Sequence, residues 1–472
     1  MTIDCRIVPH TPLRGVAART LDGAPAEAKL GHAELPSSGY TASVRLSFFT
    51  FENYRSFADL TTIEIRPLTL FFGYNSAGKS AALRLLPLVA ASVTAPGRSP
   101  LALDSEPARG ASFRDVLSKL TATPTLELGF AWTEGGEGVN LSFAIRDLPD
   151  RQTQILDKVS VHVTSEGAPR IAEALWDTDN SRPGAATQRY EFRFSDTPSE
   201  SGEALVTGLR FNVVAEHPSR FTFERGAFEL NALGLRTHWL NSLRAVPDRT
   251  ARFGPAPGRL ASDGKNAGEF LAHDSLAGGE RVARVSTWFT RVTGHQLSVK
   301  RFAVGSEQHY SVVTTPPKTS APVEIPIVDT GEGMAQVLPV IVLACLAELG
   351  DLGDDPLLAI EHPELHLHPA AHAELAAMFC SLALSGRRPT VLLETHSENF
   401  LLRVQLAIAK GEIPHGDVIV HWVRGLDDGR SVVDTIRFDE AAQPSAWPPG
   451  VFGEDSEQAK ALLKVRRERG LP

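Results

Sequence analysis

A short stretch of the chain, "FFGYNSAGKSAALRLL", gathers residue types that can hold phosphate groups. It matches the pattern G-x-x-x-x-G-K-[ST] through Gly73, Gly78, Lys79 and Ser80. Glycines let backbone N–H groups approach phosphate oxygens, a lysine can reach the β and γ phosphates, and a serine hydroxyl can bind Mg²⁺. The stretch therefore predicts a site for ATP and Mg²⁺ that is formed by Gly73, Asn75, Ser76, Ala77, Gly78, Lys79, Ser80 and Ala81.

The residues on either side of this loop have the composition that the pattern requires. The preceding run "LTLFF" is apolar enough for a buried strand, and "KSAALRLLPLVAA" is typical of a helix. A strand followed by such a loop and a helix places the positive helix N-terminus beside the phosphates. The alternative, a glycine turn without function, does not require this flanking structure.

A second acidic group for the metal is predicted in "LLAIEHPELHLHP", residues 357–369. Four apolar residues form a short strand that ends at Glu361, and ligands of open α/β sheets bind at the carboxyl ends of strands. We therefore expect Glu361 to hold Mg²⁺ together with Ser80. His362 follows directly, and its imidazole can accept a proton during catalysis. Glu364 could act in its place if the loop folds back.

The histidines of the same stretch could instead indicate a transition-metal site. His362, His366, His368 and His372 carry the right donor atoms, as do the nearby glutamates. Their spacing argues against this interpretation, because only His368 and His372 would share one helical face if Pro369 begins a helix. The alternative is that His368 packs against or caps the start of that helix.

Several motifs, in one order from about residue 45 to 455, resemble the ABC-type ATPase heads of the SMC, RecF and OLD proteins. A short bacterial branch of AAA family ATPases is more similar still. The element "FENYRSF" then places Arg55 near the nucleotide and Phe57 in the core. "WLNSLRAVPDR" makes Arg244 a candidate for phosphate contact. An exposed Arg55 and an Arg244 paired with a carboxylate remain the alternatives.

The resemblance extends to three further motifs. "VDTGEGMAQVLPVI" is similar to the signature loop, which implies that Gly331, Gly333 and Gln336 open a helix facing the γ-phosphate of a second copy. "LLETHSENFLLRV" resembles the switch segment, in which His396 contacts the γ-phosphate. "AWPPGVF" is similar to the terminal Trp-Pro-x-Gly stretch of the branch. By resemblance, ATP joins two protomers into a homodimer or a higher homo-oligomer.

One position departs from the pattern of this family. Most ABC-type heads carry two adjacent acidic residues at the strand end, and the second activates the attacking water. Here His362 occupies the second position after Glu361. We therefore assign catalytic roles to Glu361, His362 and His396, and expect ATP hydrolysis that could be slow.

The elements that must position these residues fall into five regions. Residues 1–42 are predicted to be a loosely ordered extension, 43–120 the first part of an ATPase domain, 121–235 an antiparallel β lobe that includes a strand in "FTFERGAFELNA", 236–455 the second part of the ATPase domain, and 456–472 a tail. Apolar strands that alternate with amphipathic helices predict an α/β fold with a mostly parallel sheet covered by helices. "RGLDDGRSVVDT" is expected to form a hairpin turn.

Composition limits the setting in which this domain acts. The chain has 472 residues, a formal net charge of -9 and three cysteines without CxxC spacing, which suits a reducing, cytoplasmic location. We expect no membrane span, since no apolar run approaches about 20 residues. DNA contact is possible but would need a local basic patch, for which "LLKVRRERG" is a candidate beside a solvated helix face.

The resemblance implies an ATP-dependent sensor or clamp that regulates a separately encoded effector, such as a nuclease, plausibly in bacterial antiphage defence. A transporter is disfavoured because the signature is not Leu-Ser-Gly-Gly-Gln. A nuclease within this chain is disfavoured because Asp427 and Asp428 fit a turn better than an acidic cluster. The alternative function is an ATP-bound scaffold with slow or no hydrolysis in a DNA repair or recombination complex.

Overall fold

The computed structural model describes residues 45–446 and 460–467, apart from residues 95–96, 98, 135, 152, 166–168, 184, 186, 195–196, 215–219, 318–322 and 463. The chain divides into two units, Met1–Ala42 and Ser43–Pro472, and the described residues lie in the second unit. The predicted extension 1–42 lies outside the described residues, as do most of "AWPPGVF" and most of the predicted tail 456–472.

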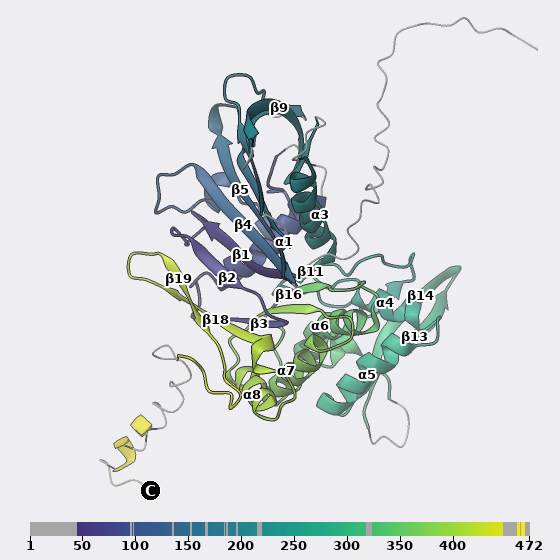
Figure 1. Cartoon of the computed structure of the whole chain (residues 1–472). Coiled ribbons are helices and arrows are strands. Elements are labelled where there is room, and N and C mark those ends of the chain that lie inside the picture. The colour runs from purple at the N-terminus through teal and green to yellow at the C-terminus, as the bar shows by residue number, and fades with distance from the viewer. Residues whose placement is uncertain are drawn as a thin grey trace, which may run out of the picture. The chain divides into compact units, whose positions relative to one another are not determined.

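A six-stranded sheet carries the phosphate loop (Figure 1). Its strands follow the order β11 (Thr237–Leu240), β16 (Leu357–Glu361), β17 (Thr390–Glu394), β3 (Leu68–Gly73), β18 (Val418–Gly425) and β19 (Ser431–Ile436). All neighbours are parallel except β18 and β19. Every residue of β3, β16 and β17 is buried, which explains their nearly unbroken apolar sequences.

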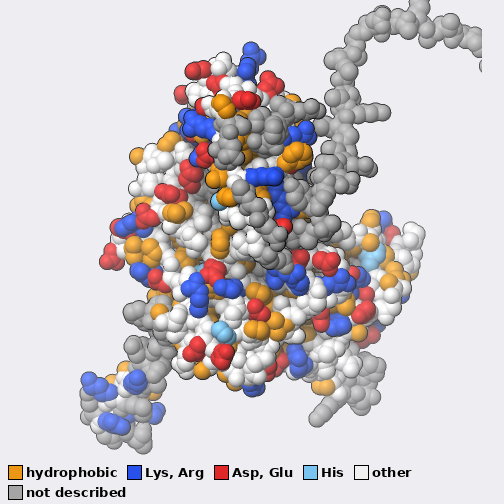
Figure 2. Space-filling view, in the orientation of Figure 1, with side chains coloured by type: hydrophobic (Ala, Val, Ile, Leu, Met, Phe, Trp, Pro, Cys, Tyr) orange, Lys and Arg blue, Asp and Glu red, His pale blue; other side chains and the backbone are white. Residues whose placement is uncertain are grey.

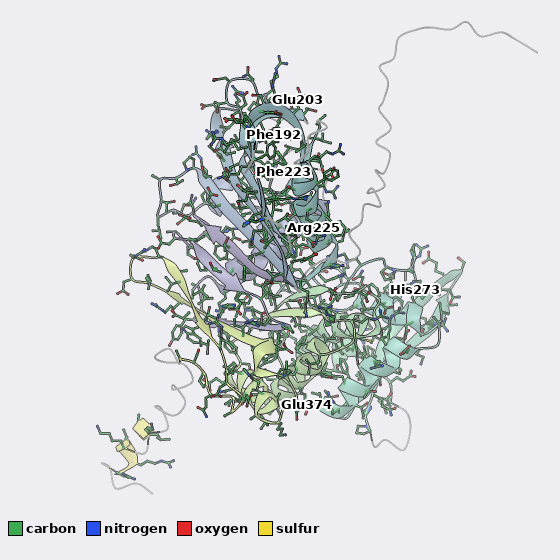
Figure 3. The ribbon with its side chains drawn as sticks, viewed as in Figure 1. Phe192, Glu203, Phe223, Arg225, His273 and Glu374 are labelled. Atoms are coloured by element: carbon green, nitrogen blue, oxygen red, sulfur yellow. The ribbon has the colours of Figure 1, made fainter. Side chains whose placement is uncertain are left out.

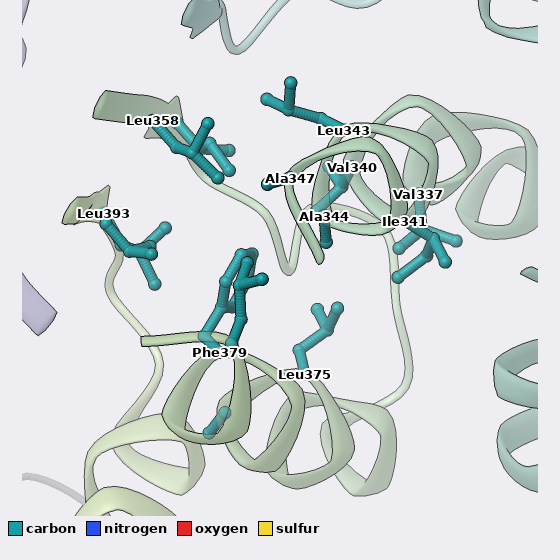
Figure 4. Close-up of a cluster of buried hydrophobic side chains, with 14 of the residues drawn as sticks. Val337, Val340, Ile341, Leu343, Ala344, Ala347, Leu358, Leu375, Phe379 and Leu393 are labelled. Carbon is teal, nitrogen blue, oxygen red and sulfur yellow. The ribbon is translucent and has the colours of Figure 1, made fainter. Parts of the chain in front are cut away.

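The two faces of this sheet are covered by different layers. Leu70, Leu358 and Leu393 face a core formed by helices α6 (Glu332–Leu349), α7 (Pro369–Ala383) and α8 (Glu398–Ala409). Figure 4 shows Leu358 and Leu393 of the strands with Leu375 and Phe379 of α7 and a row of α6 side chains. The alternate strand residues, such as Ala359 and Leu392, face helix α1 (Lys79–Thr94) in a second core.

A nine-stranded antiparallel sheet shares that second core with α1 (Figure 1). Its order is β10 (Arg210–Val213), β9 (Thr197–Thr207), β8 (Thr187–Phe194), β7 (Arg170–Trp176), β6 (Thr153–Thr164), β5 (Glu137–Leu148), β4 (Thr125–Glu134), β1 (Leu46–Glu52) and β2 (Thr61–Glu64). The expectation of a mostly parallel sheet therefore describes only the six-stranded sheet. The antiparallel sheet also takes in β1 and β2, which lie before the region predicted to form the β lobe.

The predicted strand in "FTFERGAFELNA" is wrong, because this segment lies in helix α3 (Arg220–Arg236). Its buried positions include Phe223, Gly226, Leu230 and Leu233, whose spacing follows a helical rather than an alternating period. Phe223 meets Phe192 of β8 with ring centroids 5.9 Å apart, as Figure 3 shows. The apolar residues of the segment therefore pack against one face of the sheet from a helix.

A third sheet was not predicted. Strands β13 (Gln296–Val304) and β14 (Glu307–Thr315) form a long hairpin, with short pairings of β14 to β12 (Ala251–Arg252) and β15 (Ile325–Pro326). Helices α4 (Ala267–Asp274) and α5 (Glu280–Thr293) pack beside it (Figure 1). Between residues 45 and 446, the described part of the chain also contains helix α2 (Phe113–Val116) and four 3₁₀ turns at Glu106–Ala108, Pro149–Arg151, Ile327–Asp329 and His415–Asp417.

Several predictions for the second half of the chain are confirmed. The strand that ends at Glu361, the helix that follows the signature loop and the helix that begins at Pro369 are present as β16, α6 and α7. Asp427 and Asp428 lie in the turn of the hairpin between β18 and β19. By length and composition α6 could cross a membrane, but most of it is buried inside the protein, as expected of a core helix.

Surface charge is mixed over the face visible in Figure 2, where acidic and basic side chains are interspersed with apolar ones. Lys460, Lys464, Arg466 and Arg467 of the C-terminal segment are exposed. These side chains come from the stretch that was considered as a basic patch for DNA.

Candidate functional site

The phosphate loop begins at the end of β3 and leads directly into α1. Gly73 has a φ of 141° and Gly78 a φ of 105°, which is a backbone region that L side chains rarely adopt. A Cβ atom on Gly73 would lie 1.9 Å from the carbonyl oxygen of Val423 in the paired strand β18, and one on Gly78 would lie 3.0 Å from the Phe57 ring. The loop can therefore keep this path only with glycine at both positions.

Lys79 is held inside this loop. Its side chain is buried, and Nζ donates hydrogen bonds to the carbonyl oxygens of Gly73 at 3.0 Å and Tyr74 at 2.7 Å. Burial lowers the pKa of Lys79, and the nearby Glu394 carboxylate opposes this effect. The side chains of Asn75 and Ser76 are exposed beside it, Ala77 is buried, and Ala81 is half-buried on α1.

Ser80 meets an acidic residue that the sequence did not single out. Its Oγ donates a hydrogen bond of 2.6 Å to Oε1 of Glu394, the last residue of β17. Glu394 is 2% exposed, and its Oε2 has no hydrogen-bond partner among the described residues. Burial raises the pKa of Glu394, although His362 and the Ser80 bond act in the other direction. The buried site beside Lys79 thus contains a carboxylate oxygen without a donor.

Glu361 has different partners from the predicted ones. It is fully buried at the end of β16, where Oε1 accepts from Arg84 Nε at 2.6 Å and from Trp239 Nε1 at 3.0 Å. The Arg84 guanidinium also donates to Oε2. Burial would lower the pKa of Arg84, but the bond and charge of Glu361 raise it. The hydroxyl of Ser80 therefore pairs with Glu394, and Glu361 pairs with Arg84.

The strand order explains this difference. In the register of the sheet Glu361 lies opposite Glu394, and Glu394 lies opposite Phe71 of β3. Strand β17 thus separates β16 from the strand that carries the phosphate loop. Ser80 and Arg84 are one turn apart on α1, so they face the two successive strand ends. The strand nearest the loop supplies the acidic partner of Ser80.

His362 and Glu364 lie in the loop after β16, next to Glu394 and His396. His362 has a φ of 43° and its N–H donates to the Glu394 carbonyl oxygen at 2.8 Å. Its ring nitrogens lie 3.5 Å from Glu394 Oε1 and 4.0 Å from Glu364 Oε1. Glu364 Oε1 also accepts from the N–H of His396 at 3.0 Å. The loop therefore folds back, and it brings the Glu364 carboxylate to the ends of β16 and β17.

His396 stacks on His362 with ring centroids 5.1 Å apart and an angle of 9° between the planes. Partial burial, together with the positive charges of Lys79 and His362, lowers the pKa of His396 to about 4. His396 is therefore neutral near pH 7 and can donate or accept a hydrogen bond there. His396 lies two residues after the end of β17, and its contact with the γ-phosphate stays a prediction.

Arg244 does not contact the phosphate loop. Its buried guanidinium donates to the backbone carbonyl oxygens of Glu361 and His362, and burial lowers its pKa to about 10. Gln336 Nε2 in turn donates to the Arg244 carbonyl oxygen at 3.2 Å. These two side chains support the loop after β16 from inside the protein. The described hydrogen bonds of the Arg244 guanidinium therefore go to backbone carbonyl oxygens rather than to a carboxylate, and its phosphate contact stays a prediction.

The two signature glycines lie at the start of α6. Gly331 is the exposed N-cap residue with a φ of 103°. Gly333 packs against its own chain, because a Cβ there would lie 2.5 Å from the His366 carbonyl oxygen. The N-terminus of α6 therefore packs against the loop after β16.

Arg55 lies in the loop after β1, and its guanidinium donates a long hydrogen bond of 3.5 Å to the Ala108 carbonyl oxygen. Phe57 is fully buried, as predicted, and contacts the phosphate loop at Gly78. The element that contains Arg55 therefore adjoins the loop, and the Arg55 side chain also bonds to the hydroxyl of Tyr54, which donates to the Ala81 carbonyl oxygen of α1.

The remaining histidines have structural roles. His368 is the N-cap of α7 and its Nδ1 accepts from the Ala370 N–H at 3.3 Å, which confirms the capping interpretation. His372 Nε2 donates to the Leu367 carbonyl oxygen, and its Nδ1 accepts from the Ser397 hydroxyl at 2.7 Å. Among the described residues, no group of three or more His, Cys, Asp and Glu side chains is arranged to hold a metal ion.

Sequence reasoning missed Glu394, Arg84 and Trp239. A signal for Glu394 was present, since it ends an apolar strand in "TVLLE" just as Glu361 does in "LLAIE". Arg84 follows Ser80 by four residues in a predicted helix, so both face the same side. No spacing in the sequence connects Trp239 with Glu361, which is 122 residues away.

Comparison with known proteins gives one family match. Residues 292–401 match the AAA ATPase domain. This segment runs from the end of α5 into α8 and includes the signature loop, Glu361, Glu394 and His396, while the phosphate loop lies before it. No curated protein matches the chain.

Two solved structures are similar to the chain at low identity. The first is an SMC head bound to the C-terminal winged-helix domain of ScpA, with 11% identity, a TM-score of 0.45, and coverage of 84% of this chain and 98% of the SMC chain. The second is the SMC head domain from Thermotoga maritima, with 9% identity, a TM-score of 0.38, and coverage of 83% and 98%. What the comparisons establish is similarity of residues 292–401 to an AAA ATPase domain.

Proposed function

We propose that this protein binds ATP with Mg²⁺ at the phosphate loop and hydrolyses it. The observation that carries the proposal is the group of Lys79, Ser80 and Glu394 at the junction of β3, β17 and α1. Oxygen donors are the ligands that Mg²⁺ prefers, and the unpartnered Glu394 oxygen beside the Ser80 hydroxyl fits such an ion. The ion would supply positive charge to neutralise the phosphates, and the match to an AAA ATPase domain supports the same activity.

The loop after β16 supplies groups for hydrolysis. Glu364 Oε2 is buried without a hydrogen-bond donor in the described structure, next to the stacked pair of His362 and His396. A carboxylate in that position can orient water and accept its proton, and His362 can share this role. We assign His396 to the γ-phosphate, where its neutral ring would donate a hydrogen bond.

We further propose that ATP joins two copies of the chain, with the N-terminus of α6 of one copy at the phosphates of the other. The exposed Gly331 cap supports this arrangement, because backbone N–H groups at a helix start attract phosphate. By the resemblance of its motifs to ABC-type ATPase heads, the dimer would act as a cytoplasmic sensor or clamp that controls a separate effector, such as a nuclease in antiphage defence. Contact with DNA would involve the basic C-terminal segment.

Phosphate release by the purified protein tests the enzymatic proposal. We expect ATP-dependent release by the wild type and loss of at least about tenfold in Lys79→Ala, since the lysine positions the phosphates. Lys410→Ala, which changes an exposed lysine just after α8, is the matched control. Release that is equal in Lys79→Ala and the wild type would contradict the proposal.

One observation favours a second function. His362 stands where a second acidic residue is usual, and a scaffold that holds ATP with little turnover would need no strong base there. Tight ATP binding without phosphate release would favour that scaffold, in a repair or recombination complex, over the regulatory ATPase.

A further inference from the structure

Two buried glutamates, Glu361 and Glu394, end adjacent strands and point to the same side of the sheet, toward α1. Only one of them has its hydrogen-bonding capacity satisfied by protein. Both oxygens of Glu361 accept bonds, from Arg84 and Trp239. Glu394 accepts one bond from Ser80, and its other oxygen has no described partner.

The partners of Glu361 fix it in place. The Arg84 side chain is 14% exposed, so its charge depends on the Glu361 carboxylate for compensation. Rotating Glu361 toward a metal would leave that guanidinium buried and unpaired, and would also free the Trp239 N–H. The bidentate hydrogen bonding between the Arg84 guanidinium and the Glu361 carboxylate opposes such a rotation.

Glu394 has the opposite properties. A buried carboxylate oxygen without a donor is unfavourable, and a cation is the usual remedy. Its other oxygen already lies 2.6 Å from the Ser80 hydroxyl, the group that binds Mg²⁺ in phosphate loops of this pattern. The other groups close by are Lys79, which is turned toward the loop carbonyls, the His362 imidazole at 3.5 Å, and Arg84, whose charge is compensated by Glu361.

We propose that Glu394 is the carboxylate on the metal side of the site, and that Glu361 is a positioning residue. Glu361, held by Arg84 and Trp239, fixes the end of β16 against α1, so that His362 and Glu364 lie beside Glu394. The metal role expected of Glu361 thus belongs to the strand nearer the phosphate loop. This inference rests on the proposed binding of ATP with Mg²⁺.

The test compares how strongly Mg²⁺ improves ATP affinity in the wild type, two variants and one control variant. A fluorescent ATP analogue is titrated in excess Mg²⁺ and in EDTA, and the ratio of the two dissociation constants is the readout. The variants are Glu394→Gln and the double variant Arg84→Gln/Glu361→Gln, which removes the buried ion pair as a unit and avoids an unpaired Arg84. Glu374→Gln on α7, where a half-buried glutamate pairs with Arg291 away from the phosphate loop, is the matched control. Circular dichroism verifies that each variant is folded.

For the wild type we expect Mg²⁺ to improve affinity by about tenfold, within the usual range of coupling between two ligands. Glu394→Gln should bring this ratio close to one, while the double variant keeps it within about twofold of the wild type. Electron paramagnetic resonance of Mn²⁺ with ATP should show the same loss of bound metal in Glu394→Gln alone.

The inference is overturned if the double variant loses the Mg²⁺ effect and Glu394→Gln keeps it, or if the two variants behave alike. Such results would leave the proposed function intact, because the wild type would still bind ATP more tightly with Mg²⁺. If the wild type binds no ATP in either condition, the proposed function fails and this inference fails with it.

Discussion

At the scale of single residues, the site is marked by buried carboxylate oxygens that have no hydrogen-bond donor among the described residues. Glu394 and Glu364 each have one buried oxygen without a described hydrogen-bond donor, whereas both oxygens of Glu361 accept hydrogen bonds. Proteins satisfy nearly all buried polar groups, so such oxygens mark places where water or a ligand binds. These residues, rather than the five histidines of residues 362–396, carry the chemical argument.

Replacing Glu364 with glutamine should slow hydrolysis and spare binding. The amide keeps the size of the side chain but cannot accept a proton from water, so we expect phosphate release to fall by about 10²-fold. Equilibrium titration should show ATP affinity within about twofold of the wild type, since no phosphate contact is removed. The Glu374→Gln variant on α7 is the control. Unchanged turnover would exclude Glu364 from the reaction.

The buried ion pair gives a prediction for stability. Arg84→Met alone leaves Glu361 charged and buried, and should lower the free energy of unfolding by about 3–5 kcal/mol. Arg84→Met/Glu361→Leu removes both charges and should recover most of that loss. Urea denaturation measures both variants. A double variant as unstable as the single one would contradict the pairing seen here.

At the scale of elements, the positions of strands and helices were largely predictable but their neighbours were not. "LLAIE" and "TVLLE" could be recognised as buried strands, yet nothing in the sequence orders β17 between β16 and β3. That order decides which glutamate meets Ser80. The error at α3 has a related cause, because "FTFERGAFELNA" alternates locally while its apolar residues also fit a helical face, and packing against the sheet decides between them.

The close approach of β3 and β18 gives a test at this scale. Gly73→Ala places a methyl group at the position 1.9 Å from the Val423 carbonyl oxygen, in a backbone region unfavourable for alanine. We expect the free energy of unfolding to fall by about 3 kcal/mol, as for an overpacked core site. Gly258→Ala is the control, because no heavy atom lies within 4 Å of the position that its Cβ would occupy and its φ is not positive. We expect this variant to change the free energy of unfolding little. Equal stability of the two variants in urea would refute this account of the loop.

At the scale of the whole molecule, the six-stranded and nine-stranded sheets are joined through a buried histidine. His421 of β18 is fully buried, and its Nε2 donates to the Glu64 carbonyl oxygen of β2 at 2.7 Å. Burial lowers the pKa of His421 to about 4, although the bond to Glu64 opposes this. Burial, rather than this hydrogen bond, therefore keeps the His421 imidazole neutral near pH 7.

This contact predicts a loss of stability in acid. The folded pKa of about 4 lies below the usual 6.5, so between these values the unfolded chain binds more protons. Stability from this group is complete above pH 6.5 and falls by up to roughly 3 kcal/mol as the pH approaches 4. His421→Gln, which can still donate to Glu64, should show a shallower decline in urea denaturation across this window. Parallel curves would show that His421 does not contribute.

The proposed dimer gives a prediction for assembly. Glu364→Gln, which binds ATP and hydrolyses it slowly, should accumulate as a dimer in Mg²⁺ and ATP, because hydrolysis no longer releases the bound copies. Lys79→Ala should stay in the state seen without nucleotide. Sedimentation velocity measures both, and a mass for Glu364→Gln that is independent of ATP would contradict a nucleotide-joined dimer.

The central claim is that ATP with Mg²⁺ binds at the loop that contains Lys79. Calorimetric titration of ATP into the wild type and Lys79→Ala, at a fixed excess of Mg²⁺, tests it most directly. We predict saturable binding of one ATP per chain in the wild type and an affinity at least about tenfold weaker in the variant. No saturable binding to the wild type, or equal affinity in both proteins, would contradict the claim.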